Sequence, residues 1–212
     1  MNLLECLVAI ALCMLLLNPM LKSSADLVAK QVQYEKTQAL LSEADRAFTL
    51  IGRAIHMAGY RNTASSGAGN QHASAAQIIE VEKKTGYRGS DSITIRHELS
   101  NGIDFDCIGN ALTKERTKQN LAHQGFLLDR QASLAKGVKA NGGSLICQSL
   151  DRQGRLQNTT LMNGVNQLLI EELGSKDHAK ANQQKLFKVK LQMTDGALLE
   201  LDLERTFSTR NL

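Results

Sequence analysis

Residues that could bind a metal or catalyse a reaction are few and scattered in this sequence. The five histidines show no His-x-x-x-His spacing, and they are His56, His72, His97, His123 and His178. Asp104 and Asp106 could place oxygen ligands around calcium, but a solvated turn is the simpler interpretation. Phosphate-loop, dinucleotide-binding and nucleophile-elbow spacings are not found. We therefore expect no metal site, no cofactor and no catalytic activity.

The cysteines carry more information than the histidines. Cys107 and Cys147 are the only two outside the apolar N-terminal stretch. In an oxidising compartment such a pair usually forms a disulfide, and the alternative is two buried free thiols. Cys6 and Cys13 lie in the apolar stretch, where we expect them to act as small apolar residues.

One acidic side chain, Glu5, is the only charged residue between Leu3 and Leu21. A helix of roughly 20 apolar residues can cross a bilayer, and a carboxylate within it is costly and so a functional candidate. The alternative is a carboxylate that reaches the headgroups near the helix start, where the helix dipole favours it. Pro19 removes one helical hydrogen bond, which predicts a kink or local melting.

A removable secretory signal is the rival interpretation of this stretch. Such signals carry a basic N-terminal region and a cleavage site of small residues. Residues 18–21, Asn-Pro-Met-Leu, make a poor cleavage site, and an early acid is unusual for a signal. We therefore expect a retained membrane anchor.

Helical periodicity continues from the anchor to Gly59. Beyond Lys22 apolar residues recur every seven positions, at Leu27, Tyr34, Leu41, Phe48 and Ile55. We expect a membrane half at residues 1–25, an amphipathic half at 26–59 and a β-rich globular domain at 60–212. The fold class is α+β, with the helix packed on an antiparallel sheet.

Alternating or short apolar segments predict the strands of this sheet. We expect strands at 78–81, 93–99, 125–128, 144–150, 186–193 and 197–207. Asn101-Gly102 predicts a hairpin turn, with 103–108 as the returning strand. Residues 156–161 read as a short edge, 164–173 as strand or helix, 110–124 as short helix or loop, and 63–76 as a surface loop.

Composition limits the choice of partners. The net charge is +4 and aromatic residues make up 4% of the chain, which leaves few rings for stacking on bases. Lys114, Arg116 and Lys118 form one candidate basic patch, with a solvated surface as the alternative. A nucleic-acid partner therefore stays open but unsupported.

The N-terminus, Met-Asn-Leu-Leu-Glu followed by Cys-Leu-Val-Ala-Ile, resembles that of processed type IV pilins and pseudopilins, whose fifth residue is a glutamate. Three later stretches are similar to PilW-type minor pilins: residues 55–61, residues 89–95 followed by 106–110, and residues 203–211. The last stretch also resembles the terminus of the related J-type pseudopilins of type II secretion. The resemblance implies a type IV pilin-like fold, with Pro19 slightly earlier than the family's usual helix-breaking proline.

The resemblance also implies a function and a location. If the chain is a minor pilin, the prepilin peptidase cuts it before Met1 and methylates the new terminal amine. The chain then stays in the inner membrane as a single-pass protein with its domain in the periplasm. It then joins other minor pilins and the major pilin, primes assembly and enters the pilus, near its tip. Glu5 would be neutralised by the N-terminal amine of a neighbouring subunit.

A periplasmic domain makes the disulfide between Cys107 and Cys147 the expected state, with a stabilisation of about 4 kcal/mol from closing its loop. Two alternatives to the minor pilin remain. One is a minor pseudopilin of type II secretion. The other is a tip module that binds DNA or a surface.

Overall fold

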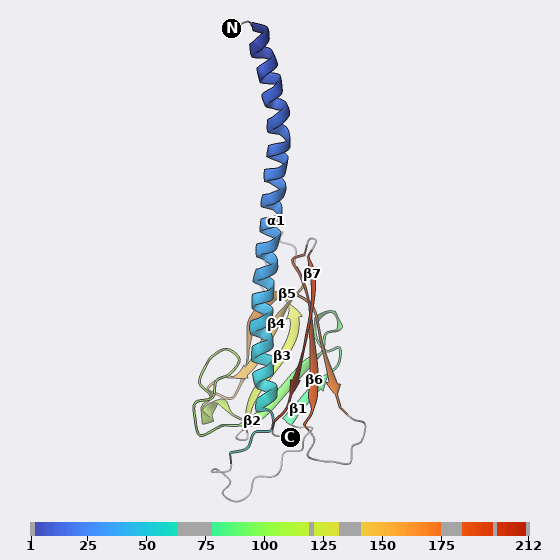
Figure 1. The fold of residues 1–212 in the computed structure, drawn as a ribbon. Helices are drawn as coiled ribbons and strands as arrows, with labels where there is room; N and C mark the ends of the chain where they lie inside the picture. The colour runs from blue at the N-terminus through green and yellow to red at the C-terminus, as the bar shows by residue number, and fades with distance from the viewer. Residues whose placement is uncertain are drawn as a thin grey trace, which may run out of the picture. The chain divides into compact units, whose positions relative to one another are not determined.

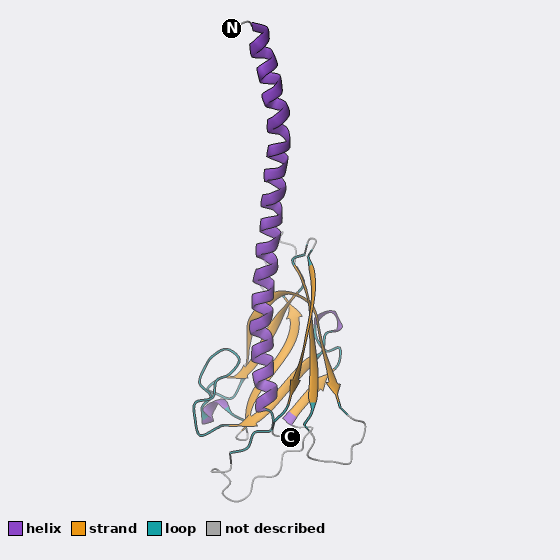
Figure 2. Cartoon of the chain, in the orientation of Figure 1, coloured by secondary structure: helices purple, strands orange, loops and turns teal. Residues whose placement is uncertain are grey.

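The computed structural model describes residues 3–62, 78–118, 121–131, 141–174, 184–196 and 199–210. Within them lie one α-helix and seven β-strands (Figures 1 and 2). The chain divides into two compact units, Met1–Ser42 and Glu43–Leu212. This division falls inside the predicted amphipathic half, 26–59, because the last turns of the helix belong to the core of the second unit.

Helix α1 spans Leu3–Met57 and stays helical on both sides of Pro19. The predicted local melting at Pro19 is therefore wrong. A proline removes one backbone bond, and the leucine-rich turns around it are strong helix formers that sustain the helix. The kink stays a prediction. The helix ends where predicted, because Gly59 has a positive φ of 71° and the Gly59 N–H donates to the Arg96 carbonyl at 3.3 Å.

The strands form one antiparallel sheet whose order follows the sequence, from β1 to β7. Their bounds are β1 Ile79–Glu82, β2 Ser92–Glu98, β3 Leu121–Arg130, β4 Gly143–Leu150, β5 Leu156–Leu173, β6 Leu186–Thr194 and β7 Glu200–Ser208. Two 3-10 turns, Tyr87–Gly89 and Lys114–Arg116, lie in the connections. The α+β class and the meandering sheet predicted from the sequence are confirmed.

The core lies between the last turns of α1 and one face of the curled sheet. Ala44, Phe48, Ile51 and Ile55 recur at helical spacing, and all are buried. The strands contribute alternate residues, as β2 and β6 show with their strict alternation of buried and less buried positions. Phe207 of β7 approaches the helix at Gly52, where a Cβ atom would lie 2.5 Å from the ring.

The predicted hairpin at Asn101-Gly102 is wrong. Residues 103–108 form no strand, and β2 pairs instead with β3. The side chains of Asp104 and Asp106 hold this segment in local turns by accepting backbone N–H groups, so those groups do not enter a ladder. The next strand, β3, starts at Leu121, four residues before the predicted strand.

The two segments predicted at 156–161 and 164–173 belong to a single strand, β5, of 18 residues. The register shifts at two points along its pairing with β4 and once near Val165 with β6. Gly164, at the junction of the two predicted segments, has a φ of 78°, which bends the strand without ending it. The loop predicted at 63–76 lies outside the described residues.

Candidate assembly segment and the loop held by the disulfide

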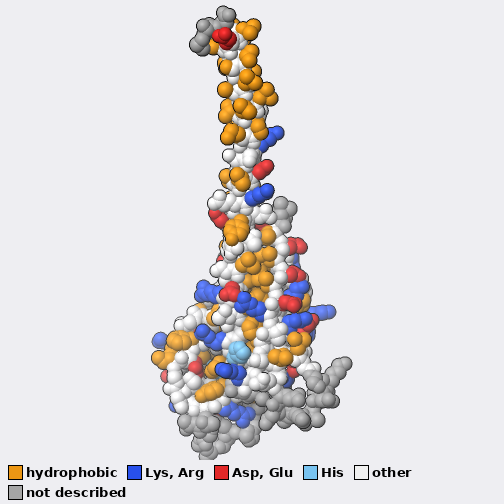
Figure 3. Space-filling model, in the orientation of Figure 1, with side chains coloured by type: hydrophobic (Ala, Val, Ile, Leu, Met, Phe, Trp, Pro, Cys, Tyr) orange, Lys and Arg blue, Asp and Glu red, His pale blue; other side chains and the backbone are white. Residues whose placement is uncertain are grey.

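The first turns of α1 carry apolar side chains on every face. Leucine, valine, isoleucine and methionine residues between Leu3 and Leu21 are all exposed, and Figure 3 shows them covering this part of the helix. The helix is long and apolar enough to cross a membrane. By length and composition, such an N-terminal helix fits a membrane anchor or a signal sequence.

Glu5 lies in the first turn of this helix, and Pro19 lies about 21 Å further along the axis at 1.5 Å per residue. Met1 lies outside the described residues. Cys6 and Cys13 are exposed on the same helix. Of the predicted processing and assembly residues, the structure describes Glu5, which lies at one end of α1.

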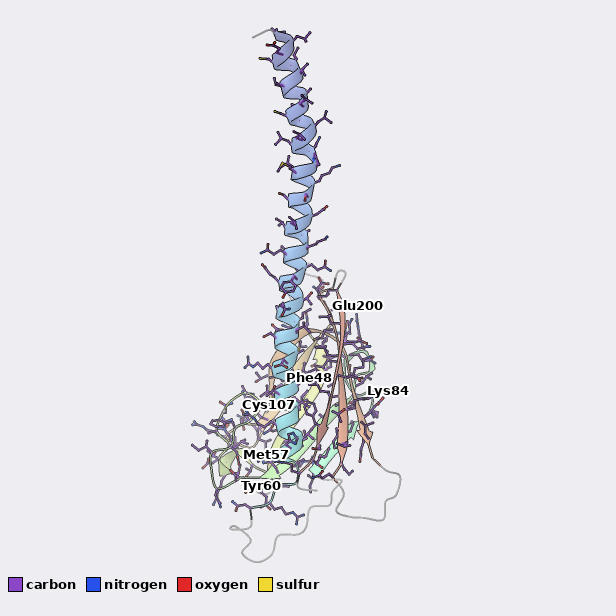
Figure 4. All side chains as sticks on the ribbon, viewed as in Figure 1. Phe48, Met57, Tyr60, Lys84, Cys107 and Glu200 are labelled. Carbon is purple, nitrogen blue, oxygen red and sulfur yellow. A yellow bond between two sulfur atoms is a disulfide. The ribbon has the colours of Figure 1, made fainter. Side chains whose placement is uncertain are left out.

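Cys107 and Cys147 form a disulfide, as the sequence predicted. Their Cα atoms are 6.2 Å apart and the bond closes a separation of 40 residues. Cys147 lies opposite Phe126 in the β3–β4 pair, and both cysteines are buried in the core. The loop that carries Cys107, labelled in Figure 4, is therefore fixed to the middle of the sheet.

Asp106 organises the same loop from within. Its buried carboxylate accepts the backbone N–H groups of Ile108 at 3.0 Å and Asn110 at 2.8 Å. The guanidinium of Arg116 lies 3.4 Å away and neutralises the charge. Four hydrogen-bond donors thus surround this carboxylate when the Asn110 side chain is counted. Burial of an ionised carboxylate is tolerable because those donors and the cation satisfy it.

The calcium interpretation of Asp104 and Asp106 loses its support. Asp104 accepts both the backbone N–H and the hydroxyl of Ser100, at 2.6 and 2.8 Å. Asp106 is occupied by its own turn and by Arg116. Among the residues that the structure describes, no group of three or more His, Cys, Asp or Glu side chains could hold a metal ion.

A second buried carboxylate, Asp91, closes the curled sheet. It accepts hydrogen bonds from the backbone of Ile170 at 2.9 Å and of Lys84 at 3.1 Å, and from the ammonium of Lys83 at 2.9 Å. Burial raises the pKa of Asp91, but these hydrogen bonds and the Lys83 charge outweigh it and hold the pKa below its ordinary value. Sequence reasoning missed this residue, although Ser90-Asp91 before an alternating strand was a visible signal.

The basic patch predicted at Lys114, Arg116 and Lys118 is divided. Arg116 is only 14% exposed and pairs with Asp106. Glu115 lies between the cations, and a hydrogen bond from the Thr113 hydroxyl lowers its pKa, so it carries a negative charge at neutral pH. The arrangement therefore offers no row of three free cations to a phosphate backbone.

The histidines that the structure describes belong to no metal-binding group. His97 faces the core and its Nδ1 lies 3.0 Å from the Glu98 carbonyl. His123 lies opposite Arg96 on the other face, and burial followed by the Arg96 charge lowers the pKa of His123 to about 4. His72 and His178 lie outside the described residues.

No protein-family model, no curated protein and no solved structure matches this chain. The function must therefore be argued from the residues and their geometry.

Proposed function

We propose that this chain is a minor type IV pilin of the PilW type, a structural subunit that primes pilus assembly near the tip. One observation carries the proposal. A single 55-residue helix begins with exposed apolar turns that contain one acid, Glu5, and ends as the core of an antiparallel meander. The surface of the first turns is almost wholly apolar. Exposing this surface to water is costly, whereas burying it in a membrane or against other apolar helices is favourable.

In this proposal Glu5 sets the axial register between the apolar helices of neighbouring subunits. A carboxylate at the centre of a bilayer costs about 3 kcal/mol on insertion scales. The ammonium group of a neighbouring subunit's Met1 would remove that penalty only at one axial offset between the two helices. Apolar packing alone tolerates many offsets, so the acid selects one.

The globular unit supplies a rigid body on the end of the helix. The disulfide fixes the 99–118 connection to β4, and Asp91 ties β2 to β5. In this proposal the unit lies in the periplasm, consistent with a disulfide, and the helix is held in the inner membrane before incorporation into the pilus. Its partners are other minor pilins, the major pilin and the prepilin peptidase that trims and methylates Met1.

Complementation in the native cell tests the proposal. The gene is deleted and replaced by wild type, by Glu5→Leu, or by the matched control Asn18→Leu, which removes another polar side chain from the same apolar stretch. Sheared surface pili are counted and secreted exoproteins are measured in parallel. We expect wild type and Asn18→Leu to restore pili, and Glu5→Leu to leave them at the level of the deletion.

Two other results would reject the minor pilin. Normal pili with blocked secretion would assign the chain to the type II secretion pseudopilins. Full restoration by Glu5→Leu, at equal protein level in the membrane, would remove the role of the acid in assembly.

A further inference from the structure

Asn101-Gly102, which forms no hairpin, lies in a set of hydrogen bonds that fits a different chemistry. The side-chain carbonyl of Asn101 accepts a hydrogen bond from the Asn62 amide at 2.7 Å. The backbone N–H of Gly102 donates to the Ser100 hydroxyl at 3.1 Å. The asparagine carbonyl carbon and the next backbone nitrogen are the two reacting atoms of deamidation, in which a cyclic imide forms and ammonia leaves. Both atoms therefore belong to groups that neighbouring side chains hold.

The fold does not require a glycine at position 102. Gly102 is not among the glycines with a positive φ, and a Cβ there would meet only the Ser100 hydroxyl, at 3.6 Å, which is an ordinary contact. The glycines of the other two Asn-Gly pairs, Gly142 and Gly164, have φ values of 75° and 78°. Backbone conformation therefore accounts for glycine at 142 and 164 but not at 102. Imide formation does favour glycine, because a side chain there would hinder the attack.

The donor to the Asn101 carbonyl is fixed in place. Asn62 is only 9% exposed, and its Nδ2 also donates to the Leu99 carbonyl at 3.1 Å. Its backbone N–H donates to the Glu98 carboxylate at 2.8 Å. Because Nδ2 of Asn62 can only donate, the oxygen of the Asn101 amide faces it and not the nitrogen. A fixed donor at this oxygen stabilises the negative charge that develops there when the carbonyl carbon is attacked.

A proton relay lies on the other side, at the attacking nitrogen. The Ser100 hydroxyl, which accepts the Gly102 N–H, donates its own proton to Oδ1 of Asp104 at 2.8 Å. The second oxygen of Asp104 accepts the backbone N–H of Ser100 at 2.6 Å, which fixes the carboxylate. A proton can therefore pass from Gly102 to Ser100 as another passes from Ser100 to Asp104. A backbone amide is a weak nucleophile, so removal of its proton by a base speeds the attack.

We propose that Asn101 is a site of self-catalysed deamidation. The Gly102 nitrogen bonds to Cγ of Asn101 as its proton passes through Ser100 to Asp104. The oxyanion at Oδ1 is held by Asn62, and its collapse breaks the bond between Cγ and Nδ2. That nitrogen takes up one proton, replacing the one that Gly102 gave, and leaves as ammonia. Water then opens the imide at either carbonyl, which gives aspartate or isoaspartate at position 101.

The other two Asn-Gly pairs provide a comparison within the same chain. The side-chain amide of Asn141 donates to the Asp195 carbonyl at 2.8 Å, and the carbonyl of Asn163 accepts the Ser144 hydroxyl at 2.6 Å. Among the hydrogen bonds between described residues, neither of the glycines that follow them gives its N–H to a hydroxyl. A donor at the carbonyl thus occurs at Asn163 without the relay, and only the 101 pair combines both.

The product changes the contact between the segment after α1 and the loop that leads to the disulfide. Asn62 would lie between two carboxylates, that of Glu98 and that formed at position 101. Isoaspartate would also lengthen the backbone by one carbon atom. Asn101 and Gly102 are exposed, so water reaches the imide. The modification marks the age of a folded chain, and it is independent of the proposed pilus function.

Timed mass spectrometry of the full chain in detergent tests the proposal. One sample is kept folded in neutral buffer, and another is unfolded in urea. After reduction of the disulfide, trypsin places the three Asn-Gly pairs in separate peptides, residues 97–114, 140–152 and 156–176. Loss of the side-chain amide is followed in each peptide, and backbone fragmentation identifies isoaspartate.

The variants separate the relay, the carbonyl donor and the nucleophile. They are Ser100→Ala, Asn62→Ala and Gly102→Ala. The matched control is Thr194→Ala, because the Thr194 hydroxyl also accepts the N–H of a glycine two residues on, Gly196, at 3.0 Å. Circular dichroism shows whether each variant is folded. If Asn62→Ala does not fold, Ser100→Ala decides the outcome.

Folding should accelerate the reaction at position 101 and slow it at 141 and 163. We expect the folded wild type to deamidate at 101 about tenfold faster than the unfolded chain, because the reacting groups are held in place. Ser100→Ala and Asn62→Ala should each slow the folded chain by about tenfold or more and change the unfolded chain little. Gly102→Ala should slow both, and Thr194→Ala should match the wild type.

Three results would overturn the proposal. The first is slower deamidation at 101 in the folded chain than in urea, which would show that the hydrogen bonds protect the asparagine. The second is faster reaction in Ser100→Ala, which would show that the hydroxyl holds the Gly102 nitrogen away from the carbonyl. The third is an equal rate at all three asparagines of the folded chain.

Discussion

The carboxylate of Asp91 accepts a hydrogen bond from the backbone nitrogen of Ile170 at 2.9 Å, and it thereby joins the start of β2 to β5, three strands further along the sheet. The adjacent Ser90 does the same for Leu168, whose N–H donates to the Ser90 hydroxyl at 3.1 Å. These contacts exist because the sheet curls until strands that are not neighbours meet. One buried acid therefore closes a structure that the ladders alone would leave open.

Replacing Asp91 with asparagine should lower the free energy of unfolding by about 2 kcal/mol, since it removes a charged acceptor from three donors. The folded pKa of Asp91 lies below its ordinary 3.8, so its contribution is complete above that value and is lost as pH falls through the folded pKa. Urea unfolding at pH 7 and near pH 3 measures both effects.

The matched control for Asp91 is Asp202→Asn. Asp202 forms an ion pair with Lys190 at 2.7 Å, but it is 52% exposed. We expect a loss below about 1 kcal/mol, as for other surface pairs. Equal losses from the two variants would show that Asp91 does not close the sheet.

Reduction of the disulfide should lower the free energy of unfolding by about 4 kcal/mol, from the loop entropy of 40 residues. Cys107→Ser/Cys147→Ala should match the reduced chain. Thermal unfolding with and without reductant, followed by circular dichroism, measures the change. An equal melting temperature with and without reductant would mean that Asp106 and Arg116 hold the loop without help from the disulfide.

Two substitutions of Gly52 distinguish the effect of helix propensity on stability from the effect of packing against Phe207. Valine there would place atoms against the Phe207 ring, which lies 2.5 Å from the position of a Cβ, and should cost about 2 kcal/mol. Alanine meets the same ring but gains about 1 kcal/mol of helix propensity, so its net cost is smaller. Urea midpoints of the two variants test this order. A stabilising valine would mean that β7 moves freely away from α1.

His123 should stay neutral through the physiological range. Burial and then the Arg96 charge lower its pKa to about 4, although the Glu80 charge opposes them and Lys118 adds a further lowering. An unfolded histidine binds its proton near pH 6.5, so stability falls as pH drops from 6.5 toward 4 and levels off below, by no more than about 3 kcal/mol. His123→Gln should flatten this slope in urea titrations. Proton NMR of the ring should give the pKa directly, and a value near 6.5 would contradict the burial.

Sequence patterns predicted the helix and most strands because their periodicity is local. The seven-residue spacing at Phe48 and Ile55 and the alternation in 186–193 each report one buried face. Cysteine counting, together with the family resemblance, predicted the disulfide. These features need no knowledge of what lies across the sheet.

The remaining features depend on partners distant in the sequence. The hairpin predicted at Asn101-Gly102 does not form, because the carboxylates of Asp104 and Asp106 accept hydrogen bonds from the backbone N–H groups of their own loop. The length of β5 depends on a bend at Gly164 that periodicity does not register. Among the described residues, 156–163 of β5 have only one neighbouring strand, because β4 and β6 pair with different parts of β5, and no local pattern encodes this.

The strand order of the sheet has a consequence for the way the chain folds. Each strand pairs with the next in sequence, so every hairpin can form as soon as its second strand has emerged. The helix end must wait far longer. Asp45 and Arg205 form a salt bridge across a separation of 160 residues, and Phe48 meets Phe207 nearby. During synthesis, the part of residues 44–55 that faces β7 therefore stays uncovered until β7 arrives, which makes it the part of the helix that a chaperone would have to shield longest.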